Sequence, residues 1–343
     1  MVKINVGFIG CGFVAQQCHL PAVESIESFE ISSLADPHPN LRERLGFKYS
    51  TKNTFSCHKE MLADANLDCV VVTLPRKLSF KIIKDCLYSK KHIFTEKPLC
   101  LSSANGQTLL DLATANNLLI MPGYMRRHDA AVSLFNKRLR EIEKSSIISI
   151  SAYCHMGDSY CAPFGDFKSI NIDPISYSEE QLPAWLPEER HVQYEQFLNV
   201  FSHITDLVEH IFNGTLSIEH ACTNDWGEGI ILCTIKGIPI SFNLLRGNQA
   251  QWREGLSIAT KERLIELSLA PAFLRNQTGF IREESGRNNR SITHTAPSYS
   301  WAFRNQMLFF RDLLVNSDYS IHYADSAVRQ IRFAEDLFVK YIA

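Results

Sequence analysis

Two glycines follow the first apolar run of the chain. Gly10, Gly12 and Ala15 give the pattern G-x-G-x-x-A directly after VGFI at residues 6–9. The first glycine permits a tight turn, and the second leaves room for a phosphate beside a helix N-terminus, whose unpaired N–H groups attract anions. The small third residue permits close packing of helix on strand. An ordinary glycine-rich turn has the same pattern, so the prediction requires a strand before it and a helix after it.

Asp36 is the second residue with possible dinucleotide chemistry. It ends the segment SLAD, 24 residues after Gly12. A carboxylate at this interval accepts hydrogen bonds from the adenosine ribose hydroxyls and repels a 2′-phosphate. The pattern therefore favours NAD as the cofactor. NADP is the alternative, because Arg42 or Arg44 could fold back onto a phosphate.

Lys97 lies in the segment TEKPLC, residues 95–100, where an apolar strand is expected to end. A buried lysine adds no obvious stability at the end of a strand. Ligands of open α/β sheets bind at the carboxyl ends of the strands. Lys97 is therefore a candidate for ligand chemistry.

The elements that must position these residues alternate along the first part of the chain. Apolar runs predict strands at residues 3–10, 29–36, 67–75, 92–98 and 118–124. Amphipathic patterns predict helices at residues 15–28, 40–45, 79–89 and 102–116. Strand and helix in alternation indicate an α/β fold with a doubly wound parallel sheet of the Rossmann type, covered on both faces.

The pattern changes after residue 126. Helices are expected at residues 130–142, 196–212, 301–314 and 324–341, and strands at 146–155, 217–224, 229–235, 238–246, 255–259 and 263–270. The tight turn in IKGIPI indicates a largely antiparallel sheet. We expect a Rossmann domain at residues 1–124 and an α+β domain with an open sheet, for substrate binding and oligomerisation, at residues 125–343. The polar segment 282–298 is expected to be a mobile loop.

Composition excludes several classes of partner. The chain has 343 residues, enough for two domains, with 45% hydrophobic residues, 21% charged residues and a net charge of −2. This charge recruits neither nucleic acid nor anionic lipid, and no apolar run approaches the roughly 20 residues of a membrane span. The ten cysteines form no C-x-x-C pair, which favours reduced thiols and a cytoplasmic location. A small-molecule ligand fits best.

Four segments together carry a family resemblance. With GCGFVAQQCHLPA, LADP, TEKPLC and GYMRRHDAA at their intervals, the chain resembles the glucose-fructose oxidoreductase / inositol dehydrogenase (Gfo/Idh/MocA) family. The resemblance implies a nicotinamide-dependent oxidoreductase that acts on a hydroxyl or ketone of a sugar, sugar derivative or (amino)cyclitol. It also implies a homodimer or homotetramer.

The resemblance further assigns candidate cofactor residues. Lys97 would reach both the nicotinamide ribose and the reacting oxygen, and the peptide bond to Pro98 is commonly cis in the family. The predicted dinucleotide contacts are Gly10, Gly12, Phe13, Val14, Asp36, Leu74, Pro75, Glu96 and Lys97.

The second catalytic element implied by the resemblance is the helix QFLNVFSHITDLVEHIF, residues 196–212. The family pattern places a His four residues after an Asp, and here His203 follows Asn199. Asparagine can orient a hydroxyl but cannot take its proton, so the acid/base role moves to His203, with Tyr194 as a second candidate. Two alternatives stay open: an NAD-dependent glycosidase, since the family that the chain resembles also contains such enzymes, and a non-catalytic dinucleotide-binding regulator, which Asn199 favours.

Two further patterns occur after residue 156. His203, Asp206 and His210 recur at helical spacing, but we expect no metal there, because a histidine in the last turn of a helix is explained by the helix dipole. The long segment between residues 157 and 189 contains aromatic residues that could stack on a sugar ring or be buried under a lid or subunit contact. These are Tyr160, Phe164, Tyr177 and Trp185.

Overall fold

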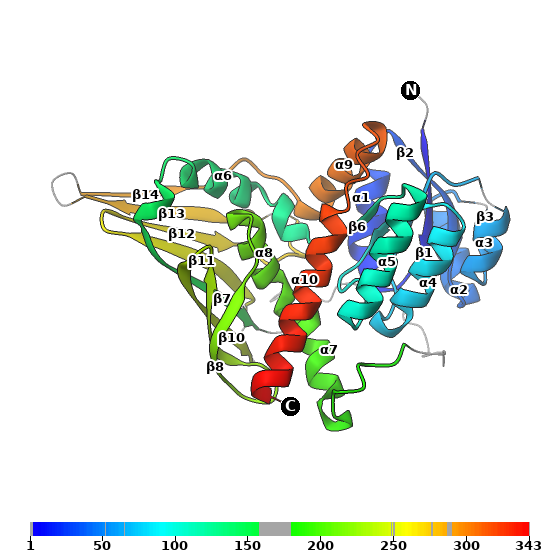
Figure 1. Cartoon of the computed structure of the whole chain (residues 1–343). Coiled ribbons are helices and arrows are strands. Elements are labelled where there is room, and N and C mark those ends of the chain that lie inside the picture. Colours follow the sequence, from blue (N-terminus) through cyan, green and yellow to red (C-terminus); the bar gives the residue numbers. More distant parts are fainter. Residues whose placement is uncertain are drawn as a thin grey trace. The chain divides into compact units, whose positions relative to one another are not determined.

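The computed structural model describes residues 3–51, 53–64, 66–157, 180–247, 249, 251–275, 277–286 and 290–342. These residues form two compact units (Figure 1). Unit 1 contains the described residues within 3–123, 180–183 and 306–331. Unit 2 contains those within 124–157, 184–305 and 332–342.

Unit 1 is built on a parallel six-stranded sheet. Its strands are β1 (Ile4–Ile9), β2 (Phe29–Ala35), β3 (Asn53–Phe55), β4 (Cys69–Val72), β5 (His92–Thr95) and β6 (Ile120–Pro122). They are arranged in the order β3-β2-β1-β4-β5-β6, which is the Rossmann order and reverses direction between β1 and β4. The predicted doubly wound α/β fold is confirmed. The short edge strand β3 was not predicted.

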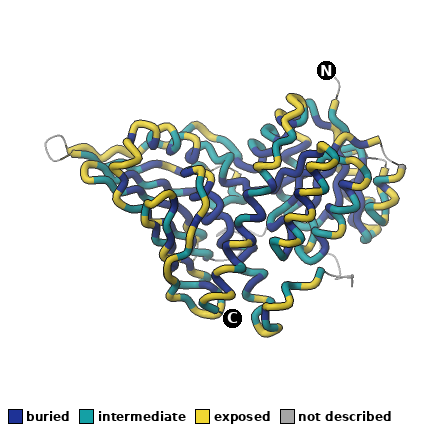
Figure 2. The backbone as a smooth tube through the Cα atoms, in the orientation of Figure 1, coloured by how far each residue is buried: buried dark blue, intermediate teal, exposed yellow. Residues whose placement is uncertain are grey.

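Helices connect these strands. They are a helical segment over residues 13–24, made of a π-helical turn (Ala15–His19) and α1 (Leu20–Glu24), then α2 (Pro39–Lys48), α3 (His58–Asp64), α4 (Arg76–Tyr88) and α5 (Ser103–Asn116). All four residues of β4 are buried. Because successive strand residues point to opposite faces, both faces of this sheet are covered. Figure 2 shows the resulting dark-blue core along the strands.

Unit 2 contains an eight-stranded sheet. Its strands are β7 (Ile147–Met156), β8 (Ser217–Thr223), β9 (Gly229–Ile235), β10 (Ile238–Arg246), β11 (Arg253–Thr260), β12 (Arg263–Leu269), β13 (Phe280–Ser285) and β14 (Ser291–Thr295). The order is β14-β13-β12-β11-β7-β10-β9-β8. Only β7 and β10 pair in parallel among the described strands of this sheet. The predicted, largely antiparallel sheet is confirmed.

One face of this sheet is packed, and the other is open as far as the described residues show. The helices of unit 2 include α6 (Ala130–Leu139), which packs on β12 and β13, α7 (His191–Val200) and α8 (Ser202–Phe212), which packs on β7. Two further helices, α9 (Ala302–Val315) and α10 (His322–Leu337), contribute residues to both units. Along β10, Ile240, Phe242 and Leu244 are buried and the residues between them are more exposed. Among the described residues, no helix has the length and apolar character of a membrane span.

Two local predictions were wrong. The segment 282–298, expected to be a loop, contains the end of β13 and all of β14, which pair antiparallel. Edge strands of an open sheet remain polar, and here Arg282 contacts both Glu266 and Glu284 across and along the strands. The single helix expected at residues 196–212 is α7 followed by α8. They meet at Phe201, whose backbone stays in the right-handed helical region.

Candidate functional site

The glycine turn joins the ends of β1 and β4. Gly10 has a φ of +82°, and a Cβ there would lie 2.3 Å from the carbonyl oxygen of Thr73. The Thr73 hydroxyl donates a hydrogen bond of 2.6 Å to the Gly10 carbonyl. Glycine is therefore required at position 10 by both conformation and space.

Gly12 lies at the open side of the same turn. A Cβ on Gly12 would meet no atom of the described chain within 4 Å. Phe13 and Val14 are the first two helical residues, and the Gln16 amide donates to the Gly12 carbonyl over 3.0 Å. The turn thus leaves an open space at the N-terminus of a helical segment. This arrangement fits a dinucleotide pyrophosphate.

Asp36 follows the last residue of β2 and is almost fully buried. One carboxylate oxygen accepts the Cys11 amide at 2.9 Å. The other accepts the His38 amide at 3.0 Å and lies 2.9 Å from His38 Nδ1. A carboxylate has about four acceptor sites, so three contacts leave capacity for a ribose hydroxyl. Arg42 donates to the backbone carbonyl of Asp36.

Leu74 and Pro75 follow the end of β4. The Leu74 side chain approaches Gly10, since its Cδ2 lies 2.9 Å from the position a Cβ would take. Pro75 is exposed and forms the N-cap of α4. Leu74 therefore lies beside the glycine turn, as a dinucleotide contact would require.

Glu96 and Lys97 follow β5. The peptide bond between Lys97 and Pro98 is cis, as the family resemblance implied. The Glu96 amide donates to the Val72 carbonyl at 2.9 Å, which ties this turn to β4. A carboxylate oxygen of Glu96 lies 2.6 Å from His19 Nε2. Burial alone would raise the pKa of Glu96, but the hydrogen bond and charge of His19, together with Lys97, lower it below its usual value.

The predicted dinucleotide residues are therefore gathered at one edge of unit 1. The glycine turn follows β1, Asp36 follows β2, Leu74 follows β4 and Glu96 follows β5. Because these strands are parallel, their carboxyl ends lie at the same edge. The reversal of strand order between β1 and β4 places the glycine turn where such sheets bind ligands.

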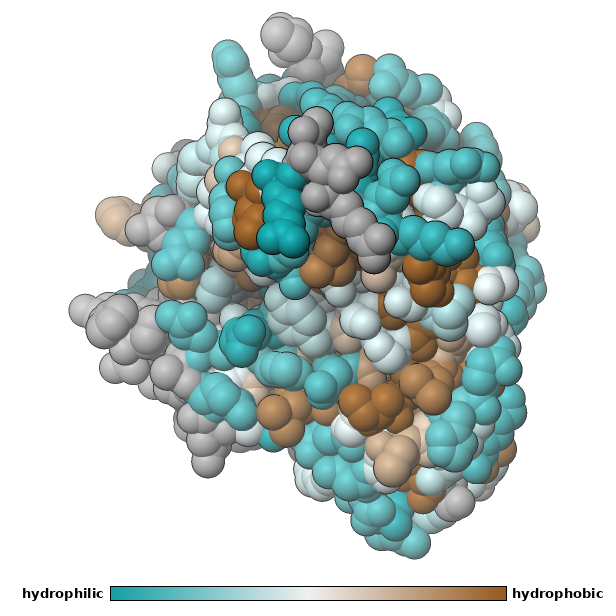
Figure 3. All heavy atoms as spheres, turned by 90° about the vertical axis from the view of Figure 1, so that its left-hand side faces the viewer, coloured by the Kyte–Doolittle hydropathy of each residue, from teal (hydrophilic) through white to brown (hydrophobic). Residues whose placement is uncertain are grey.

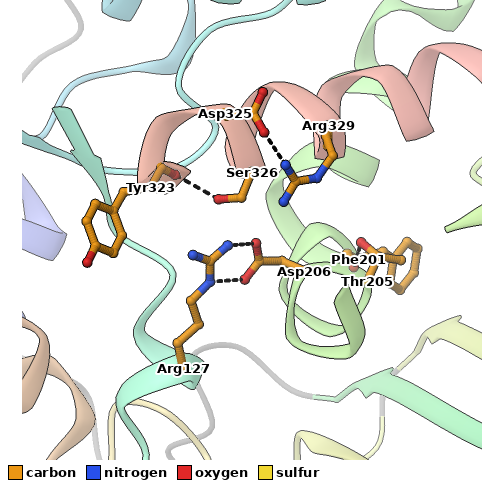
Figure 4. A network of polar contacts seen from close by, with 8 residues as sticks. All are labelled: Arg127, Phe201, Thr205, Asp206, Tyr323, Asp325, Ser326 and Arg329. Carbon is orange, nitrogen blue, oxygen red and sulfur yellow. Dashed lines mark hydrogen bonds and ion pairs between the residues drawn. The ribbon is translucent and has the colours of Figure 1, made fainter. Parts of the chain in front are cut away.

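In unit 2, His203 lies in the first turn of α8 and is 7% exposed. Its ring lies edge-on to the Tyr124 ring, with 6.4 Å between centroids. One helical turn later, the fully buried Asp206 accepts a bidentate pair from Arg127 (Figure 4). Arg127 also lies over the Tyr124 ring at 5.2 Å. Burial, followed by the charge of Asp206, raises the pKa of Tyr124 well above its usual value.

Two further histidines belong to this region. Burial and the neighbouring charges of Arg127 and His210 lower the pKa of His128 to about 3. His210 is exposed in the last turn of α8. Within the described ranges, no group of three His, Cys, Asp or Glu side chains is arranged to hold a metal. Asp206 is instead engaged by Arg127.

Tyr194 and Asn199 lie on α7. Tyr194 is fully buried, and its ring packs edge-on against Trp185 and Phe338, at 6.0 and 5.3 Å between centroids. Asn199 is partly buried. Trp185 thus supports an aromatic core. The other aromatic candidates, Tyr160, Phe164 and Tyr177, lie outside the described residues.

Sequence reasoning missed several residues of these two clusters. Local sequence patterns do not predict the contacts of Thr73, His19 and Arg127, because their partners are 63, 77 and 79 residues away in the chain. A usable signal was present for His19, a histidine within the apolar start of the first helix. Such a residue needs a buried partner.

The comparisons with known proteins support the Rossmann fold of unit 1. Residues 4–124 match the family model GFO_IDH_MocA, described as an oxidoreductase family with an NAD-binding Rossmann fold. A dTDP-3,4-didehydro-2,6-dideoxy-alpha-D-glucose 3-reductase of Saccharopolyspora spinosa is 27% identical over 36% of this chain and 37% of its own length. The myo-inositol 2-dehydrogenase of Thermotoga maritima is 23% identical over 42% of each chain. The sequence matches thus span about two fifths of these relatives.

Solved structures extend the similarity of fold to nearly the whole chain. KijD10, a 3-ketoreductase from Actinomadura kijaniata in complex with NADP and TDP-benzene, has a TM-score of 0.76 at 16% identity, over 97% of this chain and 96% of that one. A dehydrogenase (MviM) from Clostridium difficile has a TM-score of 0.74 at 18% identity, over 98% and 99%. At such identities the likeness concerns the fold.

Proposed function

The chain carries the N-terminal domain of the Gfo/Idh/MocA oxidoreductase family, and on that premise we propose that it is an NAD(P)-dependent oxidoreductase. Its reaction moves a hydride between the nicotinamide and a hydroxyl or ketone carbon of a sugar, sugar derivative or (amino)cyclitol. Relatives named as a sugar 3-reductase and an inositol dehydrogenase support this substrate class.

The open space at Gly12 is the observation that carries the proposal. It lies at the N-terminus of a helical segment and at the reversal point of a parallel sheet. A space of this kind accepts a diphosphate through backbone amides. Asp36, with acceptor capacity left over, is the residue we propose for the adenosine ribose.

The buried carboxylate of Asp36 supports NAD as the preferred cofactor. A 2′-phosphate would place further negative charge beside it, in a region of low dielectric. Arg42 is already used by the Asp36 backbone carbonyl, which weakens the case for a phosphate contact from that side chain. NADP is the alternative, and the direct comparison of the two cofactors decides between them.

We assign the polar catalytic roles to Lys97 and His203. A bound nicotinamide supplies the hydride acceptor or donor. The Lys97 ammonium stabilises negative charge on the reacting oxygen, and His203 takes or returns the hydroxyl proton. Asn199 orients the hydroxyl. Tyr194 is the weaker proton-transfer candidate, because its ring is enclosed by Trp185 and Phe338.

The test is Lys97→Ala in the full chain. Wild type is screened against neutral sugars, sugar phosphates, nucleotide sugars and cyclitols with NAD and NADP, by following the reduced-nicotinamide absorbance. The variant is expected to lose turnover on the best substrate while it binds the dinucleotide almost normally. Lys59→Ala, an exposed lysine of α3, is the control. Turnover by Lys97→Ala at the wild-type rate would remove Lys97 from the mechanism.

Asn199 favours one second candidate, a dinucleotide-binding regulator without turnover. The same screen separates the two, since a regulator binds dinucleotide but reduces none of it with any substrate. The screen also tests the alternative of an NAD-dependent glycosidase. Net accumulation of NADH would contradict it, because such an enzyme regenerates its own NAD in each turnover and, as the sole activity, would leave no NADH.

We also propose that the chain forms a homo-oligomer through the open face of the sheet of unit 2. Ile230, Leu232 and Leu245 are exposed on this face. Figure 3 looks onto the left-hand side of Figure 1 and shows apolar patches with polar side chains between them. The described cysteines are thiols rather than disulfides, which supports the proposed cytoplasmic location. Sedimentation velocity tests the oligomer.

A further inference from the structure

His19 is buried beside the proposed dinucleotide site. It is the last residue of the π-helical turn Ala15–His19, and its side chain is 0% exposed. The Leu20 amide reaches back to the Ala15 carbonyl across this turn. Single π-helical turns shift the residues that follow by one position around the helix, and they often occur at functional sites. Here the turn lies in the helical segment that begins directly after Gly12.

The His19 ring is fixed by two neighbours from the strand end that carries Lys97. Nε2 lies 2.6 Å from Glu96 Oε1, and the ring packs against Phe94, with 5.1 Å between centroids. Phe94 in turn packs edge-on against Phe310 of α9. The imidazole is therefore held by a charged hydrogen bond and by an aromatic wall.

Glu96 connects the His19 ring to the backbone of Lys97. Its second carboxylate oxygen accepts the Lys97 amide at 3.3 Å, and its own amide is bonded to the Val72 carbonyl. The carboxylate thus lies between the His19 ring and the backbone of Lys97. The contact between His19 and Glu96 joins residues 77 positions apart in the chain, so it links the helical segment after Gly12 to the turn after β5.

We infer that His19 is a positioning residue for Lys97. It fixes Glu96, and through Glu96 it fixes the backbone of Lys97. It thereby joins the helical segment at residues 13–24 to the turn after β5. The inference rests on the proposed function. His19 itself is not expected to touch cofactor or substrate. Misplacement of a reacting group by about 1 Å can lower a rate about 100-fold, so a defect here appears in kcat.

The experiment compares His19→Ala and His19→Gln with His58→Gln in the full chain. His58 is a matched control, since its Nε2 lies 2.9 Å from Asp85 Oδ2 in the same unit and joins α3 to α4. Thermal melting reports folding, titration calorimetry gives the dinucleotide Kd, and steady-state kinetics on the best substrate of wild type gives kcat and KM.

His19→Ala is expected to lower kcat about 10- to 100-fold, with dinucleotide Kd and substrate KM within about threefold of wild type. His19→Gln keeps an N–H donor near Glu96 and should retain most of kcat. Added imidazole should partly restore His19→Ala, and His58→Gln should resemble wild type.

Several results would overturn the inference. These are a kcat of His19→Ala within threefold of wild type, an equal loss in His58→Gln, or a loss confined to dinucleotide Kd. If His19→Ala does not melt cooperatively, Glu96→Gln decides, and an unchanged kcat there contradicts the positioning role. Absence of turnover by wild type on every compound contradicts the proposed function as well. Turnover unaffected by both variants contradicts this inference alone.

Discussion

The two glycines of the first turn should respond in opposite ways to the same substitution. In Gly10→Ala, a φ of +82° is imposed on an L side chain whose Cβ would lie 2.3 Å from a carbonyl oxygen. The conformation alone costs about 1–2 kcal/mol, and relief of the contact requires the backbone to move. We expect a total loss of about 2–3 kcal/mol, which lowers Tm by roughly 5–10 °C for a domain of this size.

Gly12→Ala should leave stability almost unchanged. The new methyl group meets no atom of the described chain within 4 Å, and exchange of glycine for alanine slightly restricts the unfolded chain. The methyl group would, however, occupy the space proposed for the diphosphate. We expect dinucleotide Kd to rise at least tenfold, about 1.4 kcal/mol, with Tm within about 2 °C of wild type.

Differential scanning calorimetry and a dinucleotide titration on both variants test the two expectations together. A Gly12→Ala variant that binds NAD(H) with the wild-type Kd would refute the assignment of this turn to the cofactor. A Gly10→Ala variant that melts like wild type would refute the steric argument. Either result is informative without knowledge of the substrate.

Three further predictions concern other parts of the chain. Asp36→Ala should weaken NAD binding more than NADP binding, and equal losses in the two Kd values would count against a ribose contact. His128 has a folded pKa of about 3 against 6.5 when unfolded, so its partly buried neutral ring stabilises the fold above pH 6.5 and this contribution falls as pH drops toward 3. Between pH 6.5 and 5 the loss is about 2 kcal/mol, and denaturant melts of His128→Asn should show a shallower decline. Leu232→Glu should shift sedimentation toward the monomer, and an unchanged profile would place the interface elsewhere.

Periodicity was sufficient for the elements with strong patterns. The apolar run of β4, and the glycine that follows the apolar run of β1, predicted buried parallel strands. The observed Rossmann strand order confirmed this prediction. Periodicity failed where the side chains of a strand do not alternate between buried and exposed positions. β14 has exposed residues at four of its five positions, so its strand character comes from pairing with β13, which no local pattern encodes.

In the candidate site, too, features set by the local sequence could be predicted and features set by distant contacts could not. The positions of Gly10 and Asp36 at the ends of strands could be predicted, because an apolar run stops directly before each of them. The surroundings of Tyr194 could not, since a tyrosine on a helix is equally compatible with a proton-transfer role and with a place in the core. Its ring packs against Trp185 and Phe338, which come from other segments. His19 was missed for the related reason that its partner Glu96 is distant in sequence.

The edge of unit 1 is ordered by bonds between neighbouring strand ends. The Thr73 hydroxyl holds the Gly10 carbonyl, and the Cys11 amide holds the Asp36 carboxylate. Glu96 is bonded to the strand beside it. Each bond ties a proposed ligand contact to a residue at the carboxyl end of a different strand, so the site is formed by the fold itself. Because little ordering remains for the ligand to impose, loss of the Thr73 hydroxyl should weaken dinucleotide binding through the geometry of Gly10, although no cofactor contact is assigned to the Thr73 side chain.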